Sequence, residues 1–121
     1  MSTGVLIVED EFLIAETLTA MVEDIGMSVC GAAATACEAV RLARIHEPLL
    51  VLMDVRLKGQ KDGIDAAREI RTLKFCPVIF ITGSQEPQTI ERIKSENLAA
   101  GLLFKPFQFG QLKAMIKQVL G

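Results

Sequence analysis

The run Leu49-Leu50-Val51-Leu52-Met53-Asp54 decides the fold class of this chain of 121 residues. Its five apolar residues follow Pro48 and lead directly into one carboxylate. A continuous apolar run of this length is typical of a strand covered on both faces, as in the centre of a parallel sheet. Open α/β sheets bind their ligands beyond the carboxyl ends of the strands, so we expect Asp54 at a functional edge.

The composition bounds the class of protein. A chain of this length is sufficient for one domain with a buried core, so we expect a single domain over residues 1–121. Half of the residues are hydrophobic, but no apolar run approaches the roughly 20 residues that span a bilayer. The start Met1-Ser2-Thr3-Gly4 has no charged segment or long apolar stretch of a signal peptide. These features favour a soluble, cytoplasmic domain without a membrane partner.

The charged and aromatic residues argue against a nucleic-acid binder. The net charge of −2 includes no basic stripe. Trp and Tyr are absent, so a stacking platform for bases is not expected. The cysteines Cys30, Cys37 and Cys76 are odd in number and lack the spacing of metal ligands. We expect them to be buried, reduced thiols.

The hydrophobic periodicity predicts five strand–helix units. The expected strands are residues 5–8, 28–31, 49–53, 77–82 and 101–104. Apolar residues at helical spacing lie between these strands and after the last one, where the final stripe runs from Leu112 to Leu120. Capping signals occur at Gly26, at Thr35 (paired with Glu38) and at Asp62. Ser84 is the expected cap of a helix that ends at about Asn97. This alternation implies a parallel sheet with helices on both faces and right-handed crossovers.

A parallel sheet would bring five polar side chains to one edge. Glu9 and Asp10 follow the first strand, Asp54 ends the third, Thr82 ends the fourth and Lys105 follows the last. Three carboxylates in one pocket repel each other, and a hard divalent cation such as Mg²⁺ compensates for this. Lys105 adds a positive charge and Thr82 a hydroxyl donor. The set describes an aspartate nucleophile that takes a phosphoryl group, with Mg²⁺ and Lys105 neutralising charge during transfer.

The same residues carry a resemblance to a known family. The pattern Glu9-Asp10, Asp54, Thr82 and Lys105-Pro106-Phe107 resembles the receiver domain of two-component response regulators, and the resemblance extends from Val5 to Leu120. It implies a flavodoxin-like (βα)5 three-layer sandwich with strand order 2-1-3-4-5. It also implies a stand-alone phosphorelay switch, phosphorylated on Asp54 by a histidine kinase or a histidine phosphotransfer protein.

The resemblance also implies roles for single residues. Asp10, Asp54 and the backbone carbonyl of Arg56 would ligate Mg²⁺, and Glu9 would act directly or through water. Thr82 and Lys105 would bind the phosphoryl oxygens. The Lys105-Pro106 bond would be cis, a state that X-Pro bonds reach at low cost.

Output is expected to come from protein partners. No segment follows the last helix in this sequence, so we expect signalling by protein binding or by onward phosphate transfer. The family implies a contact surface made of the fourth helix, the last strand and the last helix, for a downstream protein or a homodimer formed on phosphorylation. Beyond its own phosphoryl transfer and dephosphorylation, no enzyme activity is expected.

Several positions suggest how this chain differs from its family. Glu9 stands where Asp is commoner, and its longer reach favours a water-mediated metal contact. Leu102 stands where Tyr or Phe is usual, so we expect signalling through the Thr82 loop and the fourth helix rather than through a rotating ring. We expect the Arg56 side chain over the pocket mouth, where it would influence the lifetime of the phosphoryl group. Gly83 leaves the pocket open to a bulky phosphohistidine partner.

Three alternative functions remain open on the sequence. A Mg²⁺-dependent phosphatase or phosphotransferase with an aspartyl nucleophile typically needs a second acid two residues after the nucleophile, where this chain has Arg56. A flavodoxin-like ligand-binding module needs a phosphate-cradling loop after the first strand, where Glu9-Asp10-Glu11 repels phosphate. The intact Asp54, Thr82 and Lys105 argue against a degenerate receiver that signals without phosphorylation.

Overall fold

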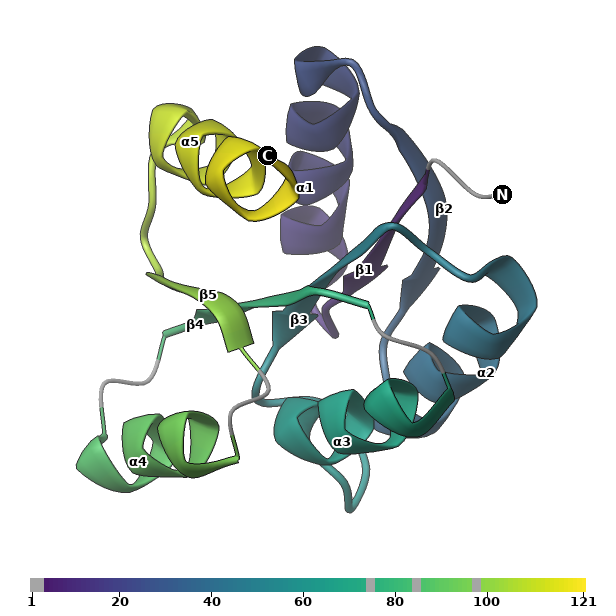
Figure 1. Ribbon diagram of the computed structural model, residues 1–121, viewed down its shortest axis with the longest axis vertical. Helices are drawn as coiled ribbons and strands as arrows, with labels where there is room; N and C mark the ends of the chain where they lie inside the picture. Colours follow the sequence, from purple (N-terminus) through teal and green to yellow (C-terminus); the bar gives the residue numbers. More distant parts are fainter. Residues whose placement is uncertain (1–3, 74–75, 84–85, 97–98) are drawn as a thin grey trace.

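The computed structural model describes residues 4–73, 76–83, 86–96 and 99–121, in which strands and helices alternate (Figure 1). The strands are β1 Gly4–Val8, β2 Ser28–Ala33, β3 Leu50–Asp54, β4 Val78–Thr82 and β5 Ala99–Phe104. The helices are α1 Phe12–Ile25, α2 Ala36–His46, α3 Gly63–Leu73, α4 Pro87–Ser95 and α5 Phe109–Leu120.

The strands form one parallel sheet in the order β2-β1-β3-β4-β5. Helices α1 and α5 cover one face, and α2, α3 and α4 cover the other, which gives three layers (Figure 1). This confirms the expected flavodoxin-like (βα)5 sandwich. Because all strands are parallel, their carboxyl ends lie along one edge of the sheet, and β1, β3 and β4 end side by side there.

The sheet separates two hydrophobic clusters, and each strand contributes to both in alternation. Val51 and Met53 pack toward α2 and α3, whereas Leu50 and Leu52 pack toward α1 and α5. Every residue of β3 is buried, including Asp54 at its end. This two-sided burial is the physical reason why the strand has no polar residue before Asp54.

Local capping signals in the sequence correspond to observed bonds. The Thr35 hydroxyl accepts a hydrogen bond from the Glu38 amide at 3.1 Å, and Gly26 ends α1 in the left-handed conformation (φ 99°). The Asp62 carboxylate accepts from the Asp65 amide at 3.0 Å, and the Asp65 carboxylate accepts from the Asp62 amide at 2.9 Å. These reciprocal bonds satisfy amides that a helix start would otherwise leave without partners.

Some strand boundaries were wrong by one or two residues. The third strand begins at Leu50, and Leu49 is 40% exposed. The fourth begins at Val78, because Pro77 has no amide to donate to the ladder. The second extends to Ala33 and the last begins at Ala99, since pairing with β1 and β4 overrides the weak strand propensity of alanine.

The start of the fourth helix and the burial of one cysteine also differ from expectation. Helix α4 begins at Pro87, whose ring suits the first helical position, and ends at Ser95. The expected cap at Ser84 and the expected end at Asn97 lie outside the described residues. Cys30 and Cys76 are partly buried, but Cys37 is exposed, because it lies off the face by which α2 packs on the sheet.

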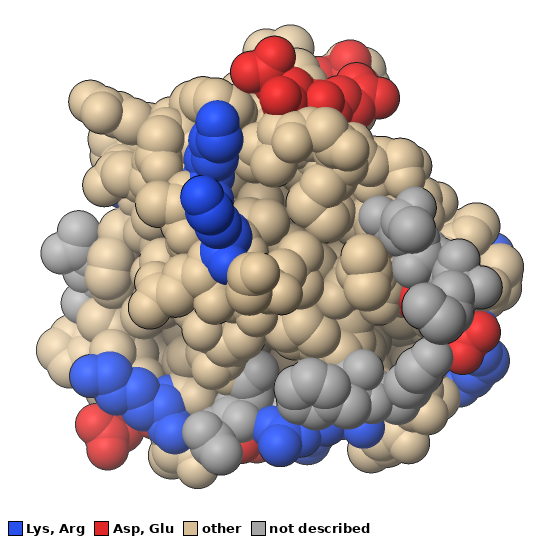
Figure 2. Space-filling view, turned by 45° about the horizontal axis from the view of Figure 1, so that its top comes forward, with Lys and Arg blue, Asp and Glu red and all other residues tan. Residues whose placement is uncertain are grey.

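The surface over α1 and α5 is mostly uncharged. Figure 2 shows one short column of basic side chains on this side and an acidic group at its upper edge. Among the described residues, none of the helices has the length and apolar content that crossing a membrane requires.

Candidate functional site

Asp54 ends the central strand and is held by its own loop. Its side chain is 9% exposed. One carboxylate oxygen, Oδ1, accepts a hydrogen bond from the Arg56 amide at 3.3 Å, and the other, Oδ2, lies 3.2 Å from Lys105 Nζ. The carboxylate is therefore oriented from two sides while one side faces the pocket described below.

Lys105 connects the end of β5 to the ends of β1 and β3. Its Nζ donates to Glu9 Oε1 at 2.7 Å as well as to Asp54, and its amide donates to the Thr82 carbonyl oxygen at 2.9 Å. Burial acts to lower the pKa of Lys105, but the hydrogen bond to Glu9 and the charges of Asp54 and Glu9 outweigh it, so the net pKa is raised. The ammonium group therefore stays charged next to Asp54. The Lys105-Pro106 peptide bond is cis.

An open pocket of about 520 Å³ lies over this edge of the sheet. Its lining residues come from the ends of several strands: Asp10, Glu11, Ile14, Asp54, Arg56, Thr82, Gly83, Glu86 and Lys105. Thr82 is 1% exposed, and a Cβ added at Gly83 would meet no atom within 4 Å among the described residues, apart from its neighbours in the chain. The pocket thus brings together four of the five predicted polar residues, Asp10, Asp54, Thr82 and Lys105, and Gly83 also lines it.

Three carboxylates in this region have the chemistry of a divalent-cation site. Glu9, Asp10 and Asp54 each offer one oxygen, and these oxygens lie within 4.8 Å of one another. Carboxylate oxygens are the ligands that Mg²⁺ prefers, usually with several waters retained, so the residues fit this ion. Glu9 differs from the other two, because it does not line the pocket and both of its oxygens have protein donors, Lys105 and the Glu11 amide.

The structure adds two residues, Glu86 and Gly63, that the sequence did not single out. The Arg56 guanidinium pairs with Glu86 just before α4, with Nη2 and Oε1 2.7 Å apart, and both side chains are more than half exposed. Gly63 packs beneath the nucleophile, since a Cβ there would lie 2.0 Å from the Asp54 carbonyl oxygen. Glu86 is distant from Arg56 in sequence, and Gly63 has no polar side chain, so no local pattern indicates either role.

Leu102 lies on β5 on the opposite side of the sheet from α5. It is partly buried and packs against the cluster formed with α2 and α3. Its side chain has no hydroxyl that could exchange hydrogen bonds with Thr82, as the sequence predicts.

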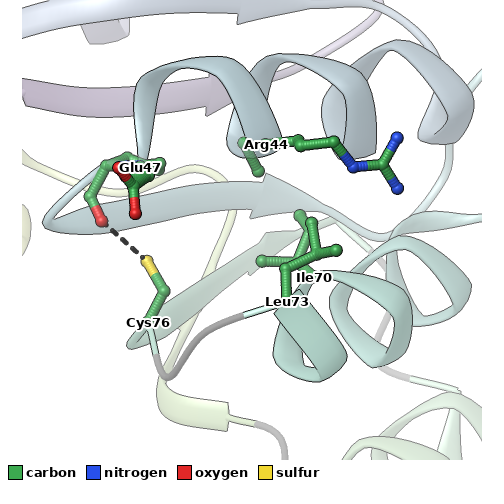
Figure 3. Close-up of a pocket in the computed structure, with 7 residues that line it drawn as sticks. Arg44, Glu47, Ile70, Leu73 and Cys76 are labelled. Atoms are coloured by element: carbon green, nitrogen blue, oxygen red, sulfur yellow. Dashed lines mark hydrogen bonds between the residues drawn. The ribbon is translucent and has the colours of Figure 1, made fainter.

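A second pocket, of about 240 Å³, lies at the other end of the sheet between α2 and α3 (Figure 3). Ile70 and Leu73 face it from α3, and the Cys76 thiol donates to the Pro48 carbonyl oxygen at 3.2 Å. Arg44 and Glu47 lie at its rim. Among the described residues that line this pocket, Glu47 is the single carboxylate, so the Asp54 pocket is the candidate site.

Comparison with known proteins places this geometry in a family. The sequence model described as "Response regulator receiver domain" matches residues 5–117. The chain is 40% identical to the transcriptional regulatory protein PdtaR of Mycobacterium tuberculosis over 108 residues, 89% of this chain and 52% of that protein. It is 42% identical to the phyllosphere-induced regulator PhyR of Methylorubrum extorquens over 122 residues, 99% of this chain and 44% of PhyR.

Solved structures agree with the sequence comparison. The signal receiver domain of a modulated diguanylate cyclase from Desulfovibrio desulfuricans G20 superposes with a TM-score of 0.90 at 38% identity, covering 99% of this chain and 94% of that one. The chain spans about half the length of the curated relatives that it matches. The similarity to those relatives therefore concerns only that part of each protein.

Proposed function

The chain belongs to the family of response regulator receiver domains, and from that premise we propose that it is a phosphorylation-dependent switch of a two-component phosphorelay. The phosphoryl group is accepted on Asp54 from a histidine kinase or a histidine phosphotransfer protein. The observation that carries this proposal is the placement of Lys105 Nζ, 3.2 Å from Asp54 Oδ2 at the head of a pocket that also contains Asp10 and Thr82.

The transfer step follows from the chemistry of the pocket. A carboxylate oxygen of Asp54 attacks the phosphorus of a phosphoimidazole. The new phosphorus–oxygen bond forms as the phosphorus–nitrogen bond breaks, and the leaving imidazole retains the bonding electron pair and is protonated from solvent. Lys105 and the Thr82 hydroxyl bind the phosphoryl oxygens and offset their charge. Gly83 leaves room for the donor's imidazole.

The acidic residues support a Mg²⁺ requirement. Asp10 and Asp54, with the Arg56 backbone carbonyl, would hold the ion. Glu9 would bind the ion directly or through a water molecule. When bound, Mg²⁺ supplies positive charge against the phosphoryl oxygens. The chain's own residues still orient the nucleophile and admit the donor.

The partners and output are part of the same proposal. We infer that a downstream protein, or a second copy after phosphorylation, binds the surface of α4, β5 and α5, and that the domain acts in the cytoplasm. It has no catalytic activity beyond its own phosphoryl transfer and dephosphorylation. The alternative hypotheses of a phosphatase or phosphotransferase and of a flavodoxin-like ligand-binding module are not favoured, because the family match covers nearly the whole chain.

Intact mass after incubation with Mg²⁺ and a small acyl phosphate tests the proposal. We expect one phosphoryl adduct on the unsubstituted protein and none on Asp54→Asn. Asp24→Asn, which removes an exposed carboxylate at the far end of α1, is the matched control and should still be labelled. No adduct on the unsubstituted protein, or an adduct that persists in Asp54→Asn, would contradict the proposed function.

A further inference from the structure

Helix α4 has little apolar anchoring. Among the described residues it buries a single side chain, Ile93, whereas each of the other helices buries at least two. Burying one isoleucine contributes roughly 1.5–3 kcal/mol, which is little to order a helix of nine residues. Other interactions must therefore help to hold α4 in place.

Ion pairs join α4 to the β3–α3 segment along its whole length. At the N-cap, Glu86 pairs with Arg56. In the middle, Arg92 Nη1 lies 2.6 Å from Asp62 Oδ2, and Arg92 Nη2 lies 2.9 Å from Asp65 Oδ1.

A third connection lies at the C-terminal end of the helix. There the Arg68 Nε donates to Glu96 Oε1 at 2.7 Å. All the partners of α4 in these pairs thus lie on the loop that follows Asp54 or on the helix after it. We call the three connections, made by Glu86, Arg92 and Glu96, the α4 clamp.

The three connections differ in strength. Arg92 spans two carboxylates, and its side chain and those of its partners are between 26% and 40% exposed, so solvent screens it only in part. The Arg56 and Glu86 side chains are 70% and 60% exposed, and an ion pair so open contributes little. At the C-cap, Glu96 Oε2 is buried without a hydrogen-bond partner among the described residues, which offsets the gain from Arg68. Arg92 is therefore the firm connection and Arg56–Glu86 the easily exchanged one.

We propose that Arg56 exchanges its ion pair with Glu86 for one with a phosphoryl group on Asp54, which opens the α4 clamp at its N-terminal end alone. This inference rests on the proposed function. Arg56 lies two residues after Asp54, and Asp54, Arg56 and Glu86 line the same pocket. A phosphoryl group on Asp54 carries close to two negative charges and three acceptor oxygens, and it competes with the single charge of Glu86 for the guanidinium. When Arg56 turns to the phosphoryl group, the N-terminal end of α4 is released while Arg92 keeps the middle in place.

The backbone supplies reporters at both ends of the helix. The amides of Thr89 and Ile90 donate to the Glu86 carbonyl oxygen at 3.1 and 3.2 Å, so their hydrogen exchange follows the placement of Glu86. The Glu96 amide donates to the Arg92 carbonyl oxygen at 3.4 Å and reports on the other end. The proposal predicts a change at the first pair of amides without a similar change at Glu96.

The first stage of the test uses unphosphorylated protein and residue-resolved hydrogen exchange. We expect Arg92→Gln to speed exchange throughout α4 by roughly five- to tenfold, and Glu86→Gln to speed it roughly threefold at Thr89 and Ile90 alone. Lys94→Gln is the matched control, because Lys94 is exposed on the same helix and forms no ion pair within the described part of the chain. If Arg92→Gln and Lys94→Gln exchange alike, the α4 clamp does not hold the helix and the proposal fails.

The second stage adds phosphorylation by an acyl phosphate, with the adduct on Asp54 verified by intact mass. In unsubstituted protein the exchange of Thr89 and Ile90 should rise to the rate seen in Glu86→Gln, and in Arg56→Gln phosphorylation should cause no further rise. An equal rise in both proteins would overturn the role of Arg56. Failure to form any adduct would instead contradict the proposed function, and with it the Arg56 exchange, whereas the first stage judges the α4 clamp by itself.

Discussion

Replacing Gly63 with alanine tests how tightly α3 packs against the backbone that carries Asp54. Gly63 is the first residue of α3, and its amide donates to the Val55 carbonyl oxygen at 2.7 Å. A Cβ at this position would lie 2.0 Å from the Asp54 carbonyl oxygen and 2.9 Å from Met53 Cγ. Contacts of Cβ atoms below 3.0 Å are essentially never seen, so α3 and the central strand would have to separate by about 1 Å.

The size of the effect follows from what can move. Overpacking typically costs about 1–3 kcal/mol where side chains can adjust. Here the blocking atom belongs to the backbone of the central strand, and moving α3 also weakens the Gly63–Val55 hydrogen bond. We therefore expect Gly63→Ala to lower the free energy of unfolding by about 3–4 kcal/mol. The thermal midpoint should fall by roughly 10–15 °C in a chain of this size.

Two other glycines provide matched controls in the same urea titration, followed by circular dichroism. At Gly101 the added Cβ would meet the Met115 sulfur at 2.8 Å, and because this is a flexible side chain we expect a loss of only about 1 kcal/mol. At Gly110, in the first turn of α5, the added Cβ would meet no described residue within 4 Å outside its chain neighbours and its own helix backbone, and alanine should stabilise by about 0.5–1 kcal/mol. If Gly63→Ala unfolds within about 1 kcal/mol of the unsubstituted protein with an unchanged m-value, the packing argument is refuted.

Four further predictions concern a cap, a buried side chain, a carboxyl group and the pocket mouth. Thr35→Ala should cost about 1 kcal/mol in urea unfolding, because the Glu38 amide loses its acceptor; a neutral result would mean that water replaces the cap fully. Ile93→Ala should cost about 2–3 kcal/mol in the same assay, since this side chain is 2% exposed, and a cost below about 1 kcal/mol would show that α4 does not depend on it. The hydrogen bond from the Asp62 amide lowers the pKa of Asp65, with help from the charge of Arg92 and against the effect of burial. The ionised Asp65 carboxylate therefore contributes fully to the free energy of unfolding above about pH 4, and this contribution is lost as the pH falls through the lowered pKa of the folded state. In Asp65→Asn the free energy of unfolding should depend less on pH below about pH 4. Arg56→Ala should change the decay rate of the phosphoryl adduct measured by intact mass, and an unchanged rate would dismiss a role for Arg56 in its lifetime.

The fold class followed from the sequence because its physical cause is local. The apolar run before Asp54 predicts a strand buried on both faces. Asp62 and Thr35 predict helix starts, because their side chains accept hydrogen bonds from amides only three residues further along the chain. Boundaries were less accurate. Whether Leu49 or Ala99 joins a strand depends on the neighbouring strand, which no local pattern contains.

The sequence predicted which residues form the candidate site, but not which hydrogen bonds and ion pairs those residues make with one another. The sequence determined that Glu9, Asp10, Asp54, Thr82 and Lys105 meet at one edge, because the carboxyl ends of parallel strands must do so. It did not show that Lys105 bridges Glu9 and Asp54, which leaves Glu9 behind the lysine rather than in the pocket. That arrangement depends on side-chain reach across strands distant in the chain.

The sequence alone therefore determined the parallel sheet, the alternation of strands and helices along the chain, and the polar residues at the carboxyl edge of the sheet. These features are patterns of neighbouring residues, so they can be recognised without the tertiary structure. The tertiary structure alone decided how α4 is held. Arg56–Glu86 and Arg92–Asp62 each join residues 30 apart, and as single charges they are indistinguishable from solvated surface residues. Ion pairs depend on the distance between two charges in space, and that distance exists only once α3 and α4 lie side by side.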